Sequence, residues 1–231
     1  MSLQRNTLRG ASGSEELMTR LIDTGLKQMT EMVLRMGELA SEAVSLSLKG
    51  YVQDINAYEE VEAISSKLIT MAEEAEDKAL ELIARFQPVA SDLRIIKSYM
   101  KVTYDLARYG RYALDISQIY MKLGGLKECE DWIRRFVMEM GEKVLNMVRI
   151  STELLKSRDT NLASSLSEIE KQVDNMYFKY LDILVEKVPA TNKCMMSSIL
   201  VVRHLERIAD HASYIGESII YLIKGEKVTL R

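Results

Sequence analysis

Closely spaced acidic residues are the side chains of this sequence with the clearest chemical potential. Six pairs of Asp or Glu lie four residues apart, a spacing that places both members on one face of a helix. These pairs are Glu38/Glu42, Glu73/Asp77, Asp77/Glu81, Glu170/Asp174, Asp182/Glu186 and Glu206/Asp210. With 34 acidic residues in 231 positions, chance gives about as many pairs. Any single pair is therefore interpreted first as part of a solvated charged face.

Two of the pairs have more support than their spacing. The last two predicted helices form an antiparallel hairpin that turns near residue 190, which sets Glu170 level with Asp210 and Asp174 level with Glu206. Each of these acidic pairs also lies beside the apolar seam of its helix. Carboxylates that converge in this way repel one another unless protons, basic side chains or cations neutralise them. Oxygen ligands favour cations such as Mg, Mn or Fe, so the sequence predicts a candidate metal site.

Basic residues offer an alternative to metal at this cluster. Arg203 and Arg207 lie on the same helix as Glu206 and are candidates to neutralise it. Neither His204 nor His211 has a Glu three residues before it, so the Glu-x-x-His pattern of di-iron carboxylate bundles is missing. His211 is left open as a metal ligand, a residue that supports a ligand, or an ordinary polar-face residue.

The elements that must position these side chains are long helices. Apolar residues recur at alternating steps of three and four, as in the series Ile133, Val137, Met140, Val144 and Met147. Equivalent seams start at Met29, Leu162 and Leu205, and no stretch alternates with the period of a strand. The chain has only 2 Pro and 11 Gly, which excludes loop-dominated folds. Breaks at Gly50, Pro88, Gly124-Gly125, Arg158-Asp159-Thr160 and Val188-Pro189 predict helices at about 14–48, 53–86, 88–122, 127–157, 160–187 and 189–224.

The two halves of the chain repeat each other. Met36-Gly37-Glu38 returns as Met140-Gly141-Glu142, and Leu106-Ala107-Arg108 returns as Leu205-Glu206-Arg207. Pro88 and Pro189 both stand at the start of a third helix. The sequence therefore predicts an all-α fold of two tandem three-helix bundles, one over residues 14–123 and one over residues 126–224.

Charge and cysteine content narrow the functional classes. The net charge of −3 gives no reason to expect nucleic-acid binding. Cys129 and Cys194 are two isolated cysteines, which we interpret as thiols in a reducing cytosol rather than a disulfide framework. Every window of 18 residues carries charge, and the N-terminus does not resemble a signal peptide. We therefore expect a cytoplasmic protein.

One segment carries a specific family resemblance. Gln87-Pro88-Val89-Ala90-Ser91-Asp92-Leu93-Arg94 closely resembles the Q-P-V-A-x-D-L-R signature of the PhoU family of phosphate-uptake regulators. Leu205-Glu206-Arg207-Ile208-Ala209-Asp210 is similar to the D-L-E-R-I-G-D-type segment of that family, with Ala209 in place of the usual Gly. The resemblance extends from about Leu17 to Ile223.

This resemblance implies a function that residue spacing does not show. PhoU proteins are not enzymes; they restrain uptake by the phosphate ABC transporter and help silence the phosphate-starvation response. The implied partners are transporter components and a sensor kinase, with membrane contact only through those partners, and the implied assembly is a homodimer. The implied cofactor is a divalent or trivalent metal ion of the Fe, Mn, Mg or Zn class. Its implied ligands are Glu170, Asp174, Glu206 and Asp210.

The first repeat departs from the family pattern. The positions equivalent to the four carboxylates hold Ser65, Ile69, Ala107 and Arg111. We expect no metal there, and we expect Arg111 to pair with Asp115 one turn further on.

Two other functions stay open from the sequence. One is a metal-binding accessory protein of a different transporter, built on the same fold. The other is a di-metal carboxylate oxidase or hydrolase, which the missing Glu-x-x-His pattern disfavours.

Overall fold

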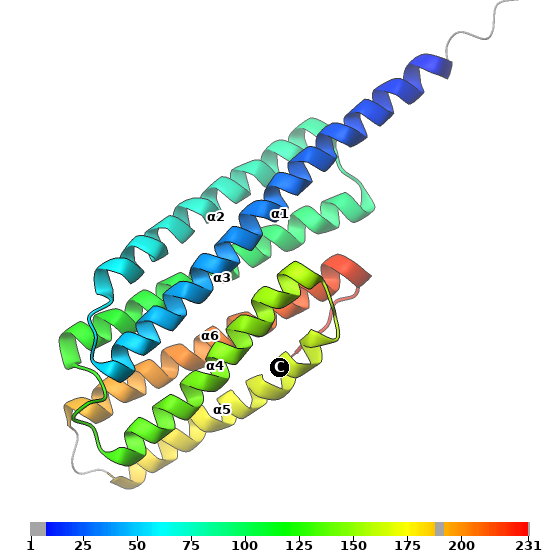
Figure 1. The fold of residues 1–231 in the computed structure, drawn as a ribbon. Coiled ribbons are helices and arrows are strands. Elements are labelled where there is room, and N and C mark those ends of the chain that lie inside the picture. The colour runs from blue at the N-terminus through cyan, green and yellow to red at the C-terminus, as the bar shows by residue number, and fades with distance from the viewer. Residues whose placement is uncertain (1–7, 188–191, 231) are drawn as a thin grey trace, which may run out of the picture.

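The described part of the chain folds into six long helices (Figure 1). The computed structural model describes the backbone of residues 8–187 and 192–230, and the side chains of residues 21–186 and 192–230. The helices are α1 (Leu8–Gln53), α2 (Tyr58–Phe86), α3 (Ala90–Leu123), α4 (Asp131–Ser157), α5 (Leu162–Lys187) and α6 (Lys193–Lys224). The described residues contain no strand. The predicted all-α fold of two tandem three-helix bundles is confirmed, with α1–α3 in the first repeat and α4–α6 in the second.

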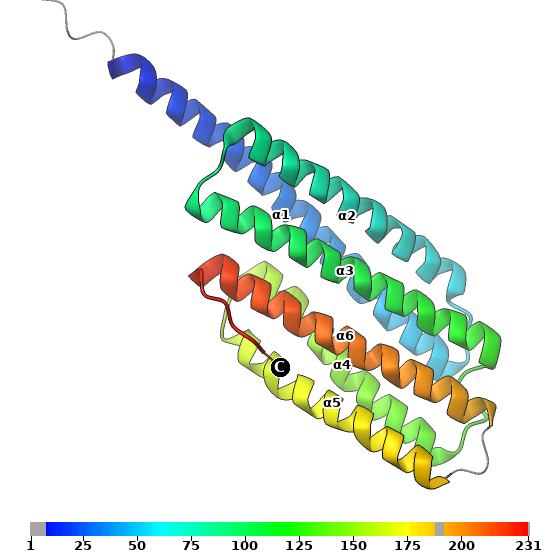
Figure 2. The ribbon, with the colours of Figure 1, turned by 180° about the vertical axis from the view of Figure 1, so that it is seen from behind.

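The two bundles share one core. They join through two helix pairs, α3 with α6 and α1 with α4, so that these four helices form the centre of the molecule. Figure 2 shows α3 and α6 side by side, with α2 and α5 on the outside. One continuous cluster of buried apolar side chains runs through both repeats. The outer helices therefore each contact their own repeat, whereas the inner helices also hold the repeats together.

The apolar seams predicted from spacing lie in this core. All five residues of the series from Ile133 to Met147 are fully buried, and the seam from Leu205 to Ile219 is buried along α6. Helix α1 buries a stripe that differs from its predicted seam, because Val33, Ala40 and Val44 are inaccessible. Three residues of the predicted seam, Met32, Leu39 and Leu46, are only half-buried. The extra buried stripe follows from the position of α1, which packs against α4 as well as against α2 and α3.

The repeated Met-Gly step marks the crossing of α1 and α4. A Cβ atom on Gly141 would lie 2.7 Å from Cδ2 of Leu48, and one on Gly37 would lie 3.4 Å from Cδ1 of Leu155. Gly141 therefore lets the first helices of the two repeats approach closely, whereas the distance at Gly37 is an ordinary contact distance. The adjoining Met36 and Met140 fill the core.

The end of α1 differs from the prediction. The helix continues through Gly50 and ends at Gln53, and Asp54 adopts a left-handed φ of 56°. The turn closes when the amide of Ile55 donates to the carbonyl of Gly50 at 2.9 Å. A Cβ atom on Gly50 would lie 2.7 Å from the carbonyl oxygen of Ile55, so glycine serves close approach here and does not end the helix.

Other predicted breaks agree with the structure. Helix α3 ends before Gly124-Gly125, and α4 ends before Arg158, which has a left-handed φ of 54°. Pro88 precedes α3 instead of lying in its first turn, since Ala90 is the first helical residue. The predicted break at Val188-Pro189 lies outside the described residues, and α6 starts at Lys193 with the Asn192 side chain accepting from the amide of Met195.

The interpretation of the two cysteines as isolated thiols is wrong. Cys129 and Cys194 form a disulfide, with their Cα atoms 5.5 Å apart. Cys129 lies in the link that precedes α4, and Cys194 lies in the first turn of α6. The fold brings these two positions together at one end of the second repeat, a proximity that a separation of 65 residues in sequence does not reveal.

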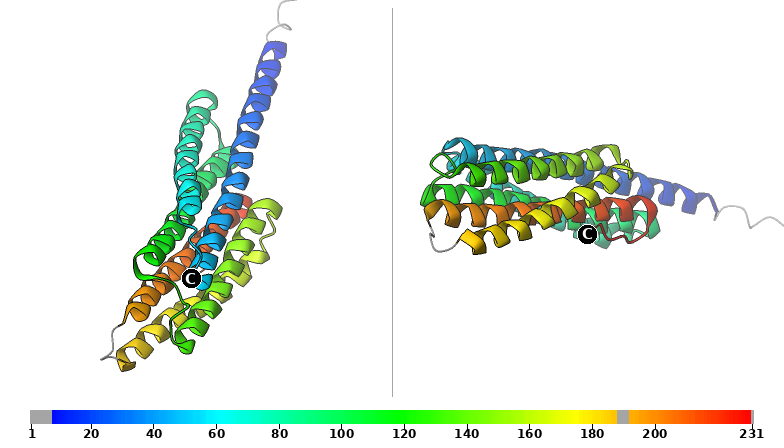
Figure 3. Two further views of the ribbon diagram at one scale, coloured as in Figure 1. Left: turned by 60° about the vertical axis from the view of Figure 1, so that its left-hand side comes forward. Right: turned by 90° about the horizontal axis from the view of Figure 1, so that it is seen from below.

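Helix α1 is the longest element, with 46 residues, and its N-terminal part extends past the ends of the other helices (Figure 3). At the other terminus, residues 225–230 fold back, and the amide of Leu230 donates to Glu217 Oε1 at 3.1 Å. None of the helices that the structure describes has a sufficiently long and apolar stretch to span a lipid bilayer.

Candidate functional site

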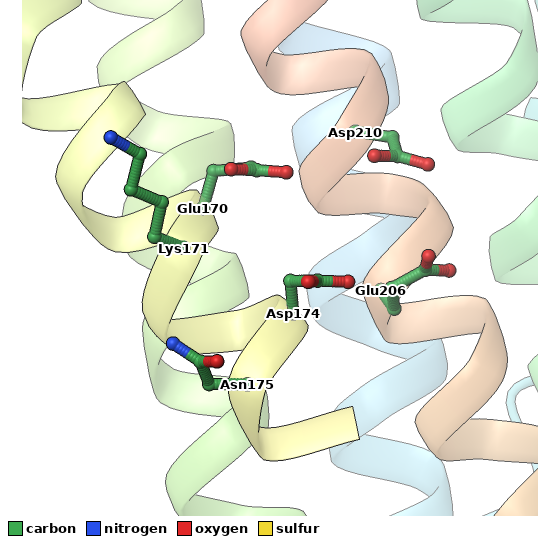
Figure 4. Close-up of a pocket in the computed structure, with 6 residues that line it drawn as sticks. All are labelled: Glu170, Lys171, Asp174, Asn175, Glu206 and Asp210. Atoms are coloured by element: carbon green, nitrogen blue, oxygen red, sulfur yellow. The ribbon is translucent and has the colours of Figure 1, made fainter. Parts of the chain in front are cut away.

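A groove between α5 and α6 collects the four predicted carboxylates. It has a volume of about 460 Å³, and Glu170, Asp174, Glu206 and Asp210 line it together with Lys171 and Asn175 (Figure 4). Glu170, Lys171, Asp174 and Asn175 come from α5, and Glu206 and Asp210 come from α6. The antiparallel hairpin therefore places all four residues as the sequence predicted.

The local packing explains why acidic residues line this groove. On α5, Val173 is fully buried beside Asp174, and on α6 Leu205 is fully buried beside Glu206. These apolar neighbours hold the two helices against α4, which leaves the next position on each helix at the edge of the interface. Near the other end of the hairpin, the hydroxyl of Tyr180 donates to Ser198 Oγ at 2.6 Å. That buried contact fixes the register of the two helices.

The four carboxylates share a groove but do not converge on one point. Glu170 and Asp174 extend from α5 toward α6, whereas the carboxylates of Glu206 and Asp210 lie over α6 itself (Figure 4). Across the part of the chain that the structure describes, no three acidic, histidine or cysteine side chains are arranged closely enough to hold a metal ion. A metal ion would therefore require rotamer changes in Glu206 and Asp210.

The electrostatics of the groove disfavour negative charge at Glu206. Burial raises the pKa of the Glu206 carboxyl, and the nearby charges of Asp210 and Asp174 raise it further. Arg203 acts in the opposite direction, because its Nη1 donates to Glu206 Oε2 at 2.7 Å. The sequence left open whether Arg203 or Arg207 neutralises this cluster. The structure assigns the direct contact to Arg203, since Nε of Arg207 donates to the Tyr112 hydroxyl at 2.9 Å instead.

The residues of the groove fit a cation. All four candidate ligands are carboxylates, the donors that hard cations of the Mg, Mn and Fe type prefer. One of them, Glu170, is 8% exposed, so its charge lies where water screens it poorly. Arg203 already places a positive group on Glu206, in the position that a cation bound by this carboxylate would take.

At the corresponding place in the first repeat, the facing helices lie close together. Ser65 is 1% exposed, and its Cα would lie 3.3 Å from a Cβ atom on Gly110 of the facing helix. The helices α2 and α3 therefore approach closely where α5 and α6 leave room. Arg111 forms the predicted ion pair with Asp115, with Nε 3.5 Å from Oδ1.

The two histidines belong to the interface between the repeats. His211 is 9% exposed, and its Nδ1 lies 2.7 Å from Oδ1 of the buried Asp105 on α3. The ring of His204 lies 5.8 Å from the ring of Tyr112, which is also on α3. Burial raises the pKa of the Asp105 carboxyl, and the contact with His211 lowers it. The sequence offered no signal for this network, because it depends on how α3 and α6 meet.

Comparison with known proteins assigns the chain to a family. The family model described as PhoU domain matches residues 33–120 and 137–219, one segment in each repeat. A protein of Clostridium acetobutylicum named "Phosphate-specific transport system accessory protein PhoU homolog" is 32% identical over 220 residues, which cover 92% of this chain and 99% of the relative. A protein of the same name from Pseudomonas putida is 31% identical, over 88% of this chain and 80% of the relative.

Solved structures agree with these matches. The crystal structure of PhoU from Pseudomonas aeruginosa matches with a TM-score of 0.80 and 28% identity, over 88% of this chain and 99% of that chain. The phosphate transport system regulatory protein PhoU from Streptococcus pneumoniae has a TM-score of 0.69 over 90% of this chain and 99% of that one. At 23% identity, this second likeness supports the fold alone.

Proposed function

Because this chain belongs to the PhoU family, we propose that it is a regulatory accessory protein of phosphate transport that restrains high-affinity phosphate uptake and phosphate-starvation signalling. The observation that carries the proposal is the similarity to relatives that are named as accessory proteins of the phosphate-specific transport system. The match covers 99% of one relative and 80% of the other. The protein acts by binding partners and has no catalytic turnover. Those partners are components of the phosphate ABC transporter and a sensor kinase.

The proposal includes a metal centre in the second repeat. Glu170, Asp174, Glu206 and Asp210 bind a divalent or trivalent ion of the Fe, Mn, Mg or Zn class in the groove between α5 and α6. Support comes from the all-carboxylate lining of the groove and from the unfavourable environment of the Glu206 charge. Bound metal relieves this repulsion and links α5 to α6. It thereby fixes the shape of the surface that partners meet.

The assembly and location are also proposals. The protein forms a homodimer and works in the cytoplasm, where it reaches the membrane only through its partners. Sedimentation velocity at tens of micromolar tests the dimer, and a monomer at that concentration contradicts it.

A phosphate-uptake assay tests the regulatory function. Cells of the source organism grown in excess phosphate are compared with and without the gene, and labelled phosphate uptake is measured. Loss of the protein is expected to raise uptake, and the wild-type gene is expected to restore restraint. Crosslinking and capture from the same phosphate-replete cells should recover components of the phosphate transporter. Recovery of a different carrier, with unchanged phosphate uptake, would instead support an accessory protein of another transporter.

A further inference from the structure

An arginine contacts one of the carboxylates that line the acidic groove. Arg203 on α6 donates from Nη1 to Glu206 Oε2 at 2.7 Å, and the central carbon of its guanidinium lies 5.3 Å from the centre of the Tyr177 ring on α5. Tyr177 follows Asp174 by three residues, and Arg203 precedes Glu206 by three. The arginine therefore spans the two helices one turn away from the level of Asp174 and Glu206.

We propose that Arg203 is a built-in counter-ion that competes with metal for Glu206 and so sets the affinity and charge selectivity of the groove. The inference rests on the proposed metal centre. A cation bound by Glu206 through Oε2 displaces the guanidinium, and Arg203 then keeps its contact with Tyr177. Weakly bound monovalent ions do not displace it, because they bring no more charge than the guanidinium already supplies.

The contacts of Arg203 make competition the expected outcome. A guanidinium stays protonated throughout the physiological pH range, so it cannot free Glu206 by losing a proton. The Arg203 side chain is 43% exposed, whereas that of Glu206 is 13% exposed. Arg203 is thus the partner that can move, since water and the Tyr177 ring both accommodate it after release.

The neighbouring Arg207 lacks this role and provides an internal control. Its Nε donates to the Tyr112 hydroxyl, which also accepts from Nη2 of Arg108 at 2.6 Å. The hydrogen bond with Tyr112 raises the pKa of Arg207, and the nearby charges of Glu206 and Asp210 raise it further. Arg207 therefore contributes to the field of the groove, whereas the hydrogen bond to Glu206 comes from Arg203.

Calorimetric titration of the full chain with Mn²⁺ tests the competition. Arg203→Gln is expected to bind Mn²⁺ about tenfold more tightly than wild type, the scale of a lost hydrogen bond to a charged group. Arg203→Lys keeps the charge and should stay within about twofold of wild type. Arg207→Gln should gain clearly less than Arg203→Gln. Arg134→Gln should change nothing, because it removes a pair of the same spacing, Arg134 with Asp131, far from the groove.

A double-mutant cycle separates direct competition from a general field. In a Glu206→Gln background, the additional Arg203→Gln change should no longer tighten Mn²⁺ binding. An unchanged or weaker affinity of Arg203→Gln, or an equal gain in Arg207→Gln, overturns the role of Arg203 while the metal centre stands. Binding by Arg203→Gln but not by wild type supports the competition in its strongest form. Absence of binding in both proteins overturns this inference together with the proposed metal centre.

Discussion

Equivalent pairs of helices in the two repeats form two different clefts. Between α5 and α6 of the second repeat, four carboxylates line an open groove, with Ala209 between the two acidic positions of α6. Between α2 and α3 of the first repeat, the equivalent of Ala209 is Gly110, and the equivalent of Glu170 is Ser65. These two small residues let α2 and α3 close against each other.

The difference shows that packing and chemistry vary independently in this fold. Leu106 and Leu205 are equivalent in the two repeats, and both are fully buried in the shared core. The residues beside them, Ala107 and Glu206, are free to differ because both are only half-buried. The outer helix pair of the first repeat is therefore closely packed, whereas the equivalent pair of the second repeat forms a groove lined by carboxylates.

The largest expected effect comes from neutralising carboxylates in the groove of the second repeat. The double variant Glu206→Gln/Asp210→Asn is expected to lower Mn²⁺ affinity more than 100-fold, because it removes both charged ligands that α6 contributes. Elemental analysis and calorimetric titration measure the loss. The fold should persist in circular dichroism, since neutralising clustered like charges relieves repulsion.

The first repeat supplies the matched control for that test. Glu73 and Asp77 form an acidic pair with the same spacing on α2, and both are exposed outside the core. The variant Glu73→Gln/Asp77→Asn should retain full Mn²⁺ binding. In crystals soaked in Mn²⁺, anomalous scattering should show a peak between α5 and α6 and none between Ser65 and Arg111. Metal retained by the Glu206/Asp210 variant would refute the assignment of these ligands.

A covalent link also distinguishes the repeats. The disulfide between Cys129 and Cys194 ties the start of the second repeat to its third helix and closes a loop across 65 positions. Its reduction should lower the free energy of unfolding by about 4 kcal/mol, through the entropy regained by the unfolded chain. Urea unfolding with and without dithiothreitol measures the change. The variant Cys129→Ala/Cys194→Ala should be insensitive to the reductant; an equal response in both proteins would contradict the link.

Closure of the first repeat depends on Gly110. In Gly110→Ala the new Cβ would lie 2.6 Å from Cδ1 of the buried Leu68 and 3.3 Å from the Cα of Ser65. Overpacking of this kind costs about 1–3 kcal/mol, which outweighs the gain of about 1 kcal/mol from better helix propensity. We expect a net loss of about 1 kcal/mol in urea unfolding. Gly37→Ala is the control, because its Cβ would meet Leu155 at an ordinary 3.4 Å; an equal gain in both variants would show that α2 and α3 are not tightly closed.

Much of this architecture could be predicted from the sequence, because the local spacing of apolar residues shows which face of a helix is buried. The steps of three and four from Ile133 to Met147 determine which side of α4 is buried, whatever its neighbours are. What lay beyond prediction are contacts between elements distant in sequence. Tyr109 contacts Ser151 and Asp105 contacts His211 where the two repeats pack against each other, and spacing alone does not orient the repeats. Cys129 pairs with Cys194 within the second repeat, across 65 positions of sequence.

For the candidate site, the sequence predicted which residues come together but not how their side chains are oriented. An antiparallel hairpin fixes the level of each residue, so it correctly brought Glu170 and Asp210, with their neighbours, to one groove. Side-chain rotamers are set by the surroundings, and sequence spacing does not contain them. The carboxylates consequently line the groove without converging on one point. The sequence named Arg203 and Arg207 as possible counter-ions, but the choice between them depended on the position of Tyr112 across the interface.

The smallest expected effect concerns Arg111, which takes the place of Asp210 in the first repeat. Its partner Asp115 lies one turn away on α3 and its side chain is 23% exposed, whereas the Arg111 side chain is 55% exposed. Exposed pairs of this spacing contribute about 0.3–0.5 kcal/mol, because water screens the charges and both side chains lose freedom. Arg111→Gln should therefore lower the free energy of unfolding by no more than about 0.5 kcal/mol, and Mn²⁺ binding should stay unchanged. Arg203→Gln removes an arginine from the open groove of the other repeat and should tighten binding. If Arg111→Gln also tightened Mn²⁺ binding, the closed cleft of the first repeat would be a cation site after all, and the contrast between the repeats would be wrong.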